Sequence, residues 1–212
     1  IIEDPAFYDY LDERKNLQIF CRLTETPFSR INEVLDIVDL LNRQFDKVSN
    51  FSYGMKQRLG IAQALLHDPK ILILDEPNNG LDPVGVNKIA DIVYRLKHEG
   101  KTICISTHSL NEVDRLCSDV AILRNGNLVV NKNIISEKKS KKYYRIETSD
   151  RQKSTEALSE MEGVRVLSSQ SNSIIISYND VNSSLLESRS LLDNSYVRSI
   201  HNESSLIEYY YD

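Results

Sequence analysis

A strand–helix–strand pattern in the middle of the chain constrains its fold more than any other feature. The run ILIL at 71–74 is short and continuously apolar, which predicts a central, buried strand of a parallel sheet. Asp82 and Pro83 then open a helix, because aspartate is a favoured N-cap and proline suits the first helical turn. Gly100 ends that helix, and TICIS at 102–106 predicts a second buried strand. This alternation predicts a layered α/β domain.

Helical segments precede this pattern, and a hairpin follows it. Apolar side chains recur at helical spacing over 31–38, and residues 55–66 form a second amphipathic helix with Ser52 as its candidate N-cap. Beyond the second strand, serine and glutamate at the two ends of 109–112 form a capping box that starts a short helix. An Asn-Gly pair between two apolar runs predicts a β-hairpin over 120–130.

A charged stretch, SEKKSKK at 136–142, divides the chain. We interpret it as a solvated linker in preference to a contact with a membrane surface. It separates a predicted domain over 1–135, whose helical subdomain covers about residues 5–66, from the region 143–212. That last region is rich in serine and asparagine and has short β-like runs, so we expect a small, separate α+β domain there.

The composition indicates a soluble globular protein, with 41% hydrophobic and 27% charged residues. A net charge of −5 argues against a nucleic-acid partner, which normally meets a basic surface. No apolar run approaches the roughly 18–20 residues of a membrane span, so any spanning part would belong to another chain. Cys21, Cys104 and Cys117 are widely spaced among apolar neighbours, which predicts reduced, packed thiols in a cytosolic protein.

Two adjacent carboxylates, Asp75 and Glu76, follow the first strand directly. A parallel sheet presents its ligand-binding residues at the carboxyl ends of its strands, so both are candidate site residues. An ion pair or a helix cap is the weaker alternative, because adjacent carboxylates repel and no Lys or Arg follows for eleven residues. Nucleotide hydrolysis uses such a pair, since the aspartate can hold Mg²⁺ and the glutamate can orient and deprotonate the attacking water.

Four short motifs surround these carboxylates, namely FSYGM at 51–55, ILILDE at 71–76, NGLD at 79–82 and STH at 106–108. In this order the chain resembles the ATP-binding cassette (ABC) ATPases. The motifs match the signature, the Walker B strand, the D-loop and the switch-histidine segment of that family in turn. Any one of them alone is weak evidence, whereas the four together are highly specific.

The resemblance extends to both ends of the chain. Residues 1–17 look like the segment after the Q-loop in cassette subunits of the bacitracin- and lantibiotic-export type. In those subunits a glutamate commonly replaces the Q-loop glutamine, which makes Glu3 the matching residue of the nucleotide site. The tail SSLIEYY at 204–210 resembles the closing helix of the small C-terminal domain in the same subfamily.

The resemblance implies a role for each motif residue. Glu76 would be the general base, His108 would hydrogen-bond the γ-phosphate of ATP, and Asp75 would hold Mg²⁺. Ser52 and Gly54 would present a helix N-terminus to the γ-phosphate bound on a partner subunit, because free N–H groups and the helix dipole there suit an anion.

Other motif positions leave alternatives open. Asp82 either caps its helix or acts across a dimer through the D-loop. Asn78 stands where the family often has Thr or Ser, and no role follows from the sequence. The histidines without such a context, His67, His98 and His201, are predicted to be surface residues.

The glycine-rich phosphate loop G-x-x-x-x-G-K-[ST] is not found in the sequence. A Gly-Lys-Thr at 100–102 lacks the earlier glycine and ends a helix instead of opening one, so we regard it as a coincidence. In the family, the phosphate loop would precede Ile1, and the chain also starts without Met. We therefore expect an N-terminal truncation that removes the Walker A part, and a chain that alone binds MgATP poorly and is inactive.

The fold class implied is α/β, a partial P-loop NTPase (RecA-like) ABC ATPase core with a helical subdomain, followed by a small α+β C-terminal domain. The implied function is the ATP-hydrolysing subunit of an ABC exporter, with peptide antibiotics as the expected cargo and ATP and Mg²⁺ as cofactors. Expected partners are a second cassette, in a homodimer or heterodimer, and an integral membrane permease, which places the subunit at the cytoplasmic face of the membrane. Two alternatives stay open: a soluble cassette ATPase acting on nucleic acid or ribosomes, and a non-catalytic fragment.

Overall fold

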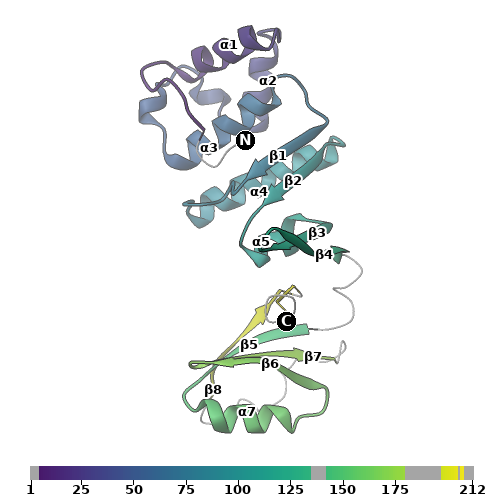
Figure 1. Cartoon of the computed structure of the whole chain (residues 1–212). Helices are drawn as coiled ribbons and strands as arrows, with labels where there is room; N and C mark the ends of the chain where they lie inside the picture. Colours follow the sequence, from purple (N-terminus) through teal and green to yellow (C-terminus); the bar gives the residue numbers. More distant parts are fainter. Residues whose placement is uncertain (1–4, 135–141, 180–196, 205, 208–212) are drawn as a thin grey trace. The chain divides into compact units, whose positions relative to one another are not determined.

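The computed structural model describes residues 5–134, 142–179, 197–204 and 206–207 (Figure 1). The chain divides into two compact units, Ile1–His108 and Ser109–Asp212, which we call the first and the second unit. Most of the predicted linker, residues 136–141, lies outside the described residues. The domain boundaries that we predicted at 135 and 143 therefore stay predictions.

Helices come first in the first unit, and the two strands follow. In chain order its elements are α1 (Glu13–Leu23), α2 (Arg30–Ile37), the short 3₁₀ helices η1 (Leu41–Arg43) and η2 (Val48–Asn50), α3 (Tyr53–Leu65), β1 (Ile71–Asp75), α4 (Pro83–His98) and β2 (Thr102–Ser106). Helices α1, α2 and α3 gather beside the two strands, while α4 runs along the β1–β2 pair (Figure 1). We call α1, α2 and α3 the helical layer.

The predicted strand–helix–strand unit is confirmed. Strands β1 and β2 are parallel, and their register places Asp75 opposite Ser106. Helix α4 is the crossover between them and ends before Gly100, whose φ of +81° is a conformation that favours glycine. Parallel pairing through a crossover helix brings the carboxyl ends of both strands to one edge of the sheet.

The helical layer has an apolar core, as its sequence periodicity predicts. Ile31, Val34 and Leu35 of α2 are fully buried, and so is Val38 just after the helix. The facing stripe of α3 is buried too, through Leu59, Ala62, Leu65 and neighbouring residues. Burial of such side chains is the main free-energy term that holds two helices together.

The prediction that β1 and β2 are buried strands is wrong for the described residues, because β1 is buried on one face only and β2 has no buried residue. Leu72 and Leu74 are buried, but Ile71 and Ile73 are 63% and 62% exposed. Among the described residues β1 pairs only with β2, and α4 packs on β2. The alternating exposure along β1 shows that one face of the strand pair is covered and the other is open. Cys104 of β2 lies on the open face and is exposed, which corrects its prediction as a packed thiol, whereas Cys21 is buried as predicted.

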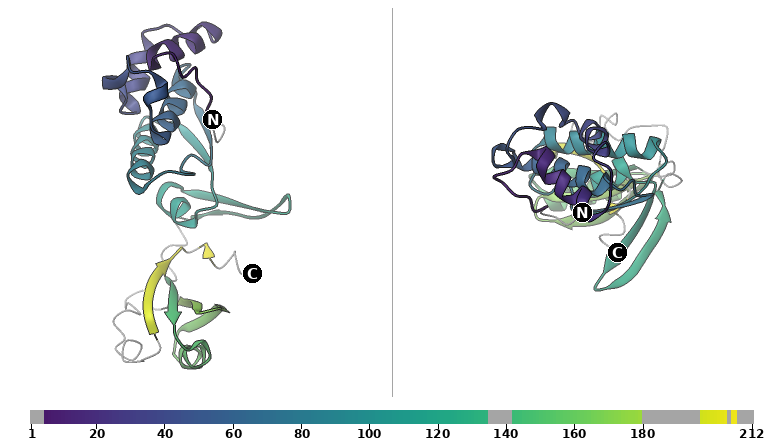
Figure 2. Two further views of the ribbon diagram at one scale, coloured as in Figure 1. Left: turned by 90° about the vertical axis from the view of Figure 1, so that its left-hand side faces the viewer. Right: turned by 90° about the horizontal axis from the view of Figure 1, so that it is seen from above.

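The second unit is mainly β-structure. Its described elements are α5 (Leu110–Leu116), β3 (Asp119–Arg124), β4 (Asn127–Asn133), β5 (Lys142–Thr148), α7 (Arg151–Ser159), β6 (Val164–Gln170), β7 (Ser173–Tyr178) and β8 (Val197–Glu203). Figure 2 shows β3 and β4 as a long two-stranded ribbon. This hairpin confirms the prediction, because Asn125 and Gly126 have φ values of +51° and +79°, as a type I′ turn requires.

One helix start in this unit differs from its prediction. Ser109 is the N-cap of α5, but its side chain makes no capping hydrogen bond, so the serine bond of the predicted capping box does not form. The residue has a φ of −93° and a ψ of 105°, and the backbone N–H of Glu112 bonds the Ser109 carbonyl instead. The first turn of α5 is therefore held by main-chain bonds.

Strands β5 to β8 form one antiparallel sheet in the order β6-β7-β5-β8. With α7 between β5 and β6, this order is that of a split β-α-β arrangement. One face packs on α7 through a core of five buried residues, Tyr144, Ile146, Leu158, Ile174 and Ile176. On the other face Tyr143 and Ile175 are buried with Ile207 near the end of the chain.

Helix α5 packs with residues from both sides of the predicted linker. Val113 of α5 shares a buried cluster with Ile134 and Leu206, which explains why the second unit begins at Ser109. Residues 205 and 208–210 of the predicted closing helix lie outside the described residues. None of the helices in the described ranges combines the length and apolar character that a membrane crossing requires.

Candidate functional site

The carboxyl ends of β1 and β2 bring together residues that lie far apart in the sequence. Asp75 is the last residue of β1, and Ser106 is the last residue of β2. Their side chains meet directly, because the Ser106 hydroxyl donates a hydrogen bond to Asp75 Oδ1 at 2.5 Å. Glu76 and His108 follow these two residues closely, so the register of the strand pair places all four at one edge.

Glu76 and His108 form a hydrogen-bonded pair. His108 Nδ1 lies 3.0 Å from Glu76 Oε1 and 3.1 Å from Oε2. A neutral ring that donates from Nδ1 to this carboxylate carries its lone pair on Nε2, so the contact selects one tautomer. The Glu76 side chain is 27% exposed and that of His108 is 79% exposed, which leaves the pair accessible to a ligand or to water.

Glu76 has a strained backbone that the neighbouring strand holds in place. Its φ is +42°, a left-handed conformation that is uncommon for residues other than glycine. The Glu76 N–H donates to both the carbonyl and the hydroxyl oxygen of Ser106, each at 3.1 Å. The Glu76 carbonyl accepts from the Asn79 N–H at 3.0 Å. This sharp turn lets two adjacent carboxylates engage different partners, Ser106 and His108.

Ser106 is the residue of this site to which sequence reasoning assigned no role. Its hydroxyl accepts from the Glu76 N–H and donates to Asp75, so one side chain orients both carboxylate residues. The signal that could have identified it is the strand register, because a parallel partner of β1 must place some residue opposite Asp75.

A second part of the candidate site lies at the start of α3. Ser52 caps this helix as predicted, accepting from the Met55 N–H at 3.3 Å. Gly54, in the first turn, lies so close to Leu81 that an added Cβ would be 3.4 Å from Leu81 Cδ2. A Cβ on Gly80 would likewise be 3.5 Å from the Tyr53 ring. The FSYGM and NGLD motifs are therefore in contact within one unit.

Asp82 caps α4, as one of its two predicted roles requires. Its Oδ1 accepts from the Gly85 N–H at 2.7 Å, and Pro83 is the first residue of the helix. The other predicted role, across a dimer, stays a prediction. Glu3 lies outside the described residues, so its assignment also stays a prediction.

Asn78 is buried in the turn between Glu76 and Gly80. Asn78 is only 8% exposed, and neither atom of its side-chain amide has a hydrogen-bond partner among the described residues. A buried amide without a hydrogen-bond partner lowers stability, so the replacement of Thr or Ser by Asn78 is not a neutral exchange at the protein surface.

Comparison with known protein families identifies a match in the first unit. A family model described as ABC transporter matches residues 7–79. That range contains α1 to α3, β1 and the Asp75–Glu76 pair, and it ends before His108.

Several characterised and uncharacterised proteins are similar to the chain. The bacitracin transport ATP-binding protein BcrA of Enterococcus faecalis is 42% identical over 71% of this chain and 50% of its own length. The lantibiotic transport ATP-binding protein SrtF of Streptococcus pyogenes is 42% identical over 62% of this chain and 58% of its own length. YhcH of Bacillus subtilis, an uncharacterized ABC transporter ATP-binding protein, is 46% identical over 65% of this chain and 46% of its own length. The chain thus spans about half the length of the curated relatives it matches.

Solved structures show the same fold. The chain aligns with cbiO1 from Clostridium perfringens, part of the ABC transporter complex cbiONQ, with a TM-score of 0.57 and 28% identity over 63% of this chain and 56% of that one. It also aligns with MJ1267, an ATP-binding cassette of an ABC transporter, with a TM-score of 0.54 over 59% of this chain and 56% of that one. At 20% identity the second likeness concerns the fold alone.

Proposed function

We propose that the chain is part of an ATP-binding cassette ATPase and works in the ATP-hydrolysing subunit of an exporter of peptide antibiotics. The ABC transporter family model that matches residues 7–79 and the bacitracin and lantibiotic transport relatives support this proposal. The subunit pairs with a second cassette and energises a separate membrane permease from the cytoplasmic face. The names of the bacitracin and lantibiotic transport relatives support the class of cargo. The geometry of the carboxylate edge supports the chemistry.

One observation carries the proposal: the Glu76–His108 pair stands beside the Asp75–Ser106 pair at the carboxyl ends of two parallel strands. A carboxylate that accepts from an imidazole is held in place yet keeps lone pairs for a water proton. Glu76 is therefore the general base that orients and deprotonates the attacking water. His108 positions that carboxylate through Nδ1–H, and a ring that also carries a proton on Nε2 donates a second hydrogen bond to the γ-phosphate.

Asp75 fits the part of a magnesium ligand. Among the described residues no group of three or more His, Cys, Asp or Glu side chains could hold a metal by itself. Mg²⁺ suits such a site, because it is usually bound through one or two carboxylates, with waters and substrate phosphates completing its shell. The ion, when bound with ATP, neutralises charge on the phosphates. Ser106 fixes the Asp75 carboxylate for this contact through its hydroxyl.

The start of α3 supplies the anion-binding surface for the partner's nucleotide. Ser52 and Gly54 lie where free N–H groups and the helix dipole favour a negative charge. Gly54 faces Leu81, so the start of α3 and the NGLD segment lie next to each other. A head-to-tail dimer then completes each site with the signature of the other subunit, while Asp82 links the two through the D-loop.

The test is hydrolysis by a polypeptide in which a phosphate loop precedes Ile1. We expect Glu76→Gln to keep ATP binding and to lower the rate of hydrolysis by about a hundredfold or more, because the general base is lost. Glu162→Gln, an exposed glutamate of the second unit, is the matched control and should hydrolyse ATP normally. Equal turnover by Glu76→Gln and wild type would refute the assignment.

The chain by itself, without a phosphate loop, should bind MgATP weakly and hydrolyse none, because the loop supplies the main cradle for the phosphates. Titration with a fluorescent ATP analogue measures this directly. A longer polypeptide that binds ATP and still fails to hydrolyse it would favour the non-catalytic alternative.

A further inference from the structure

The turn that follows α2 is held from two directions. Arg58 of α3 donates from Nη1 to the carbonyl oxygens of Val38 and Asp39, at 2.7 and 2.8 Å. These carbonyls end α2 and need partners outside the helix, and α3 provides them. Asp39 itself has a φ of +55°, a conformation that aspartate tolerates better than most side chains.

Helix α4 holds the same turn through two ion pairs. Lys88 Nζ lies 2.5 Å from Asp39 Oδ2, and Arg95 Nη2 lies 2.9 Å from Asp36 Oδ2. Lys88 and Arg95 are seven residues apart, which is about two helical turns, so both cations project from one face of α4. The hydrogen bond from Lys88 lowers the pKa of the Asp39 carboxyl, which keeps it charged at neutral pH.

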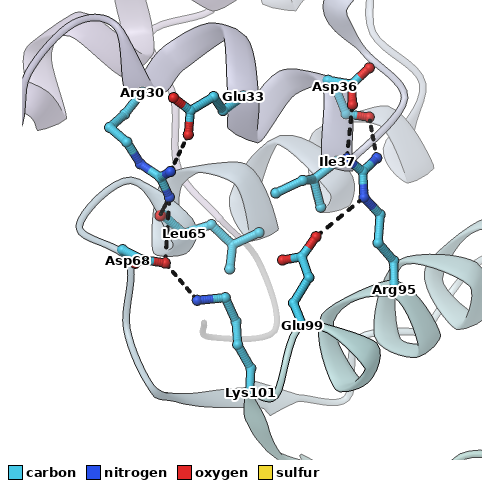
Figure 3. A pocket seen from close by; sticks show the side chains of 9 residues that line it. All are labelled: Arg30, Glu33, Asp36, Ile37, Leu65, Asp68, Arg95, Glu99 and Lys101. Atoms are coloured by element: carbon cyan, nitrogen blue, oxygen red, sulfur yellow. Dashed lines mark hydrogen bonds and ion pairs between the residues drawn. The ribbon is translucent and has the colours of Figure 1, made fainter.

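The helical layer and α4 line a charged cleft at this place. A cleft of about 340 Å³ contains Asp39, Arg58, Lys88 and Arg95 among its lining residues. A neighbouring cleft of about 280 Å³ has the same character (Figure 3). Figure 3 shows Arg95 bonded to Asp36 on one side and to Glu99 on the other. Ion pairs that are accessible to solvent fix the relative position of two elements, yet breaking such a pair costs little free energy.

We propose that Lys88 and Arg95, paired with Asp39 and Asp36, form an electrostatic clamp that sets the position of the helical layer relative to α4. The clamp lies close to the two helix starts that the candidate site uses. Arg58 is about one turn after Gly54 in α3, and Lys88 is about two turns after Asp82 in α4. Lys88 and Arg95 are positioning residues, and Arg58 holds the same turn through its bonds to two carbonyl oxygens. Only the consequence of the clamp for the signature and the D-loop rests on the proposed function.

The test measures the separation of α2 and α4 in the chain itself, without nucleotide. Spin labels are attached to cysteines introduced at Asn32 of α2 and His98 of α4, both exposed. The accessible cysteines, Cys104 and Cys117, are replaced by serine, while Cys21 is buried and stays. Pulsed electron paramagnetic resonance then gives the distance distribution between the labels.

Two matched double variants separate charge from packing. In K88M/R95M both clamp cations are lost and the apolar stems are kept, so we expect a shifted or broadened distance distribution. In K88R/R95K the charges are kept, and the wild-type distribution should return. Asp91→Asn is the control, because it removes a charge from the same helix and the same cleft. The Asp91 carboxylate forms no ion pair among the described residues, so the distance distribution should not change.

Hydrogen exchange supplies an independent readout. The Leu40 N–H bonds the Leu35 carbonyl at 2.9 Å across the end of α2, so its exchange rate reports opening of the turn. Loss of two partly exposed ion pairs in K88M/R95M should raise that rate by about fivefold. Amides of β7 in the second unit should exchange as in wild type, which shows that the chain stays folded.

Each outcome decides the question. A wild-type distance distribution in K88M/R95M overturns the clamp, and so does an equal broadening in K88R/R95K or in Asp91→Asn. None of these measurements uses ATP, so a failed clamp leaves the proposed hydrolysis untouched. Conversely, a Glu76→Gln variant that hydrolyses ATP normally would refute the proposed general base and leave the measured spin-label distances unaffected.

Discussion

Glu13 shows how one buried side chain can set the pH dependence of the fold. The residue is fully buried at the start of α1, and neither carboxylate oxygen has a hydrogen-bond partner among the described residues. Burial raises the pKa of this carboxyl from 4.5 to about 8, with Arg58 acting in the opposite direction and Asp46 and Asp12 adding to the rise. Between those two pH values the folded chain holds a proton that the unfolded chain releases. The free energy of unfolding therefore falls as the pH rises through this window.

The variant Glu13→Gln removes the titrating group and tests this dependence. At pH 7 the raised pKa lowers the stability of the wild type by about 3 kcal/mol relative to a chain with an unshifted carboxyl. We expect the free energy of unfolding in urea to fall between pH 5 and pH 8 in the wild type and to change much less in Glu13→Gln. Parallel pH profiles for the two proteins would contradict the argument, whatever their absolute stabilities.

Ser106 can be tested without any nucleotide. Ser106→Ala removes the hydroxyl that donates to Asp75 and accepts from Glu76, and the Glu76 N–H keeps only its carbonyl partner. We expect the free energy of unfolding to fall by about 1 kcal/mol, the usual value for such a bond. Ser106→Thr keeps a hydroxyl and should recover most of the loss in the same urea titration. Equal losses in both variants would argue that the hydroxyl is unimportant.

At the scale of elements, the start of α4 separates the two roles of Asp82. Asp82→Ala removes the cap on Gly85 and should lower the free energy of unfolding by about 1 kcal/mol, whereas Asp82→Asn should retain it, because asparagine caps equally well. The measurement is thermal or urea unfolding of the chain. If hydrolysis by a polypeptide with a phosphate loop falls in Asp82→Asn while stability holds, the D-loop role is supported; unchanged hydrolysis leaves capping alone.

Local patterns predicted most of these elements correctly. Helical periodicity located α2 and α3, the Asp-Pro start and the Gly100 stop bounded α4, and Asn-Gly marked the turn between β3 and β4. Each signal acts within a few residues, so it can be recognised in a sequence. The open face of β1 could not be predicted in this way. A continuous apolar run indicates that both faces of a strand can be buried, but it does not indicate which elements cover them.

The candidate site follows the same rule. Asp75 and Glu76 were predicted as candidate site residues because they follow an apolar strand, whereas His108 was identified through the resemblance of STH at 106–108 to the switch-histidine segment. The roles of Ser106 and Asn78 depend on the strand register and on burial, which arise only when distant segments pack. Glu13 escaped prediction for the same reason: nothing in its neighbours along the chain indicates that its carboxylate is enclosed.

For the whole molecule, the important feature is that each unit encloses a core of its own. The helical layer buries residues such as Leu59 and Val34, all before His108. The β5–β8 sheet buries Tyr144, Ile146 and Ile174 against α7, all after Ser109. Cooperativity follows contiguous apolar packing, so two enclosed cores should unfold as two transitions and not as one.

Reciprocal core substitutions test this independence. Ile174→Ala removes a fully buried side chain from β7 and should lower the free energy of unfolding of the second unit by about 3 kcal/mol, through lost burial and the cavity left behind. Hydrogen exchange in α2 and α3 should not change, because their core contains none of the affected contacts. Leu59→Ala should do the reverse, speeding exchange in the helical layer and leaving β7 alone. If either substitution loosened both units equally, the two cores would have to be treated as one cooperative structure.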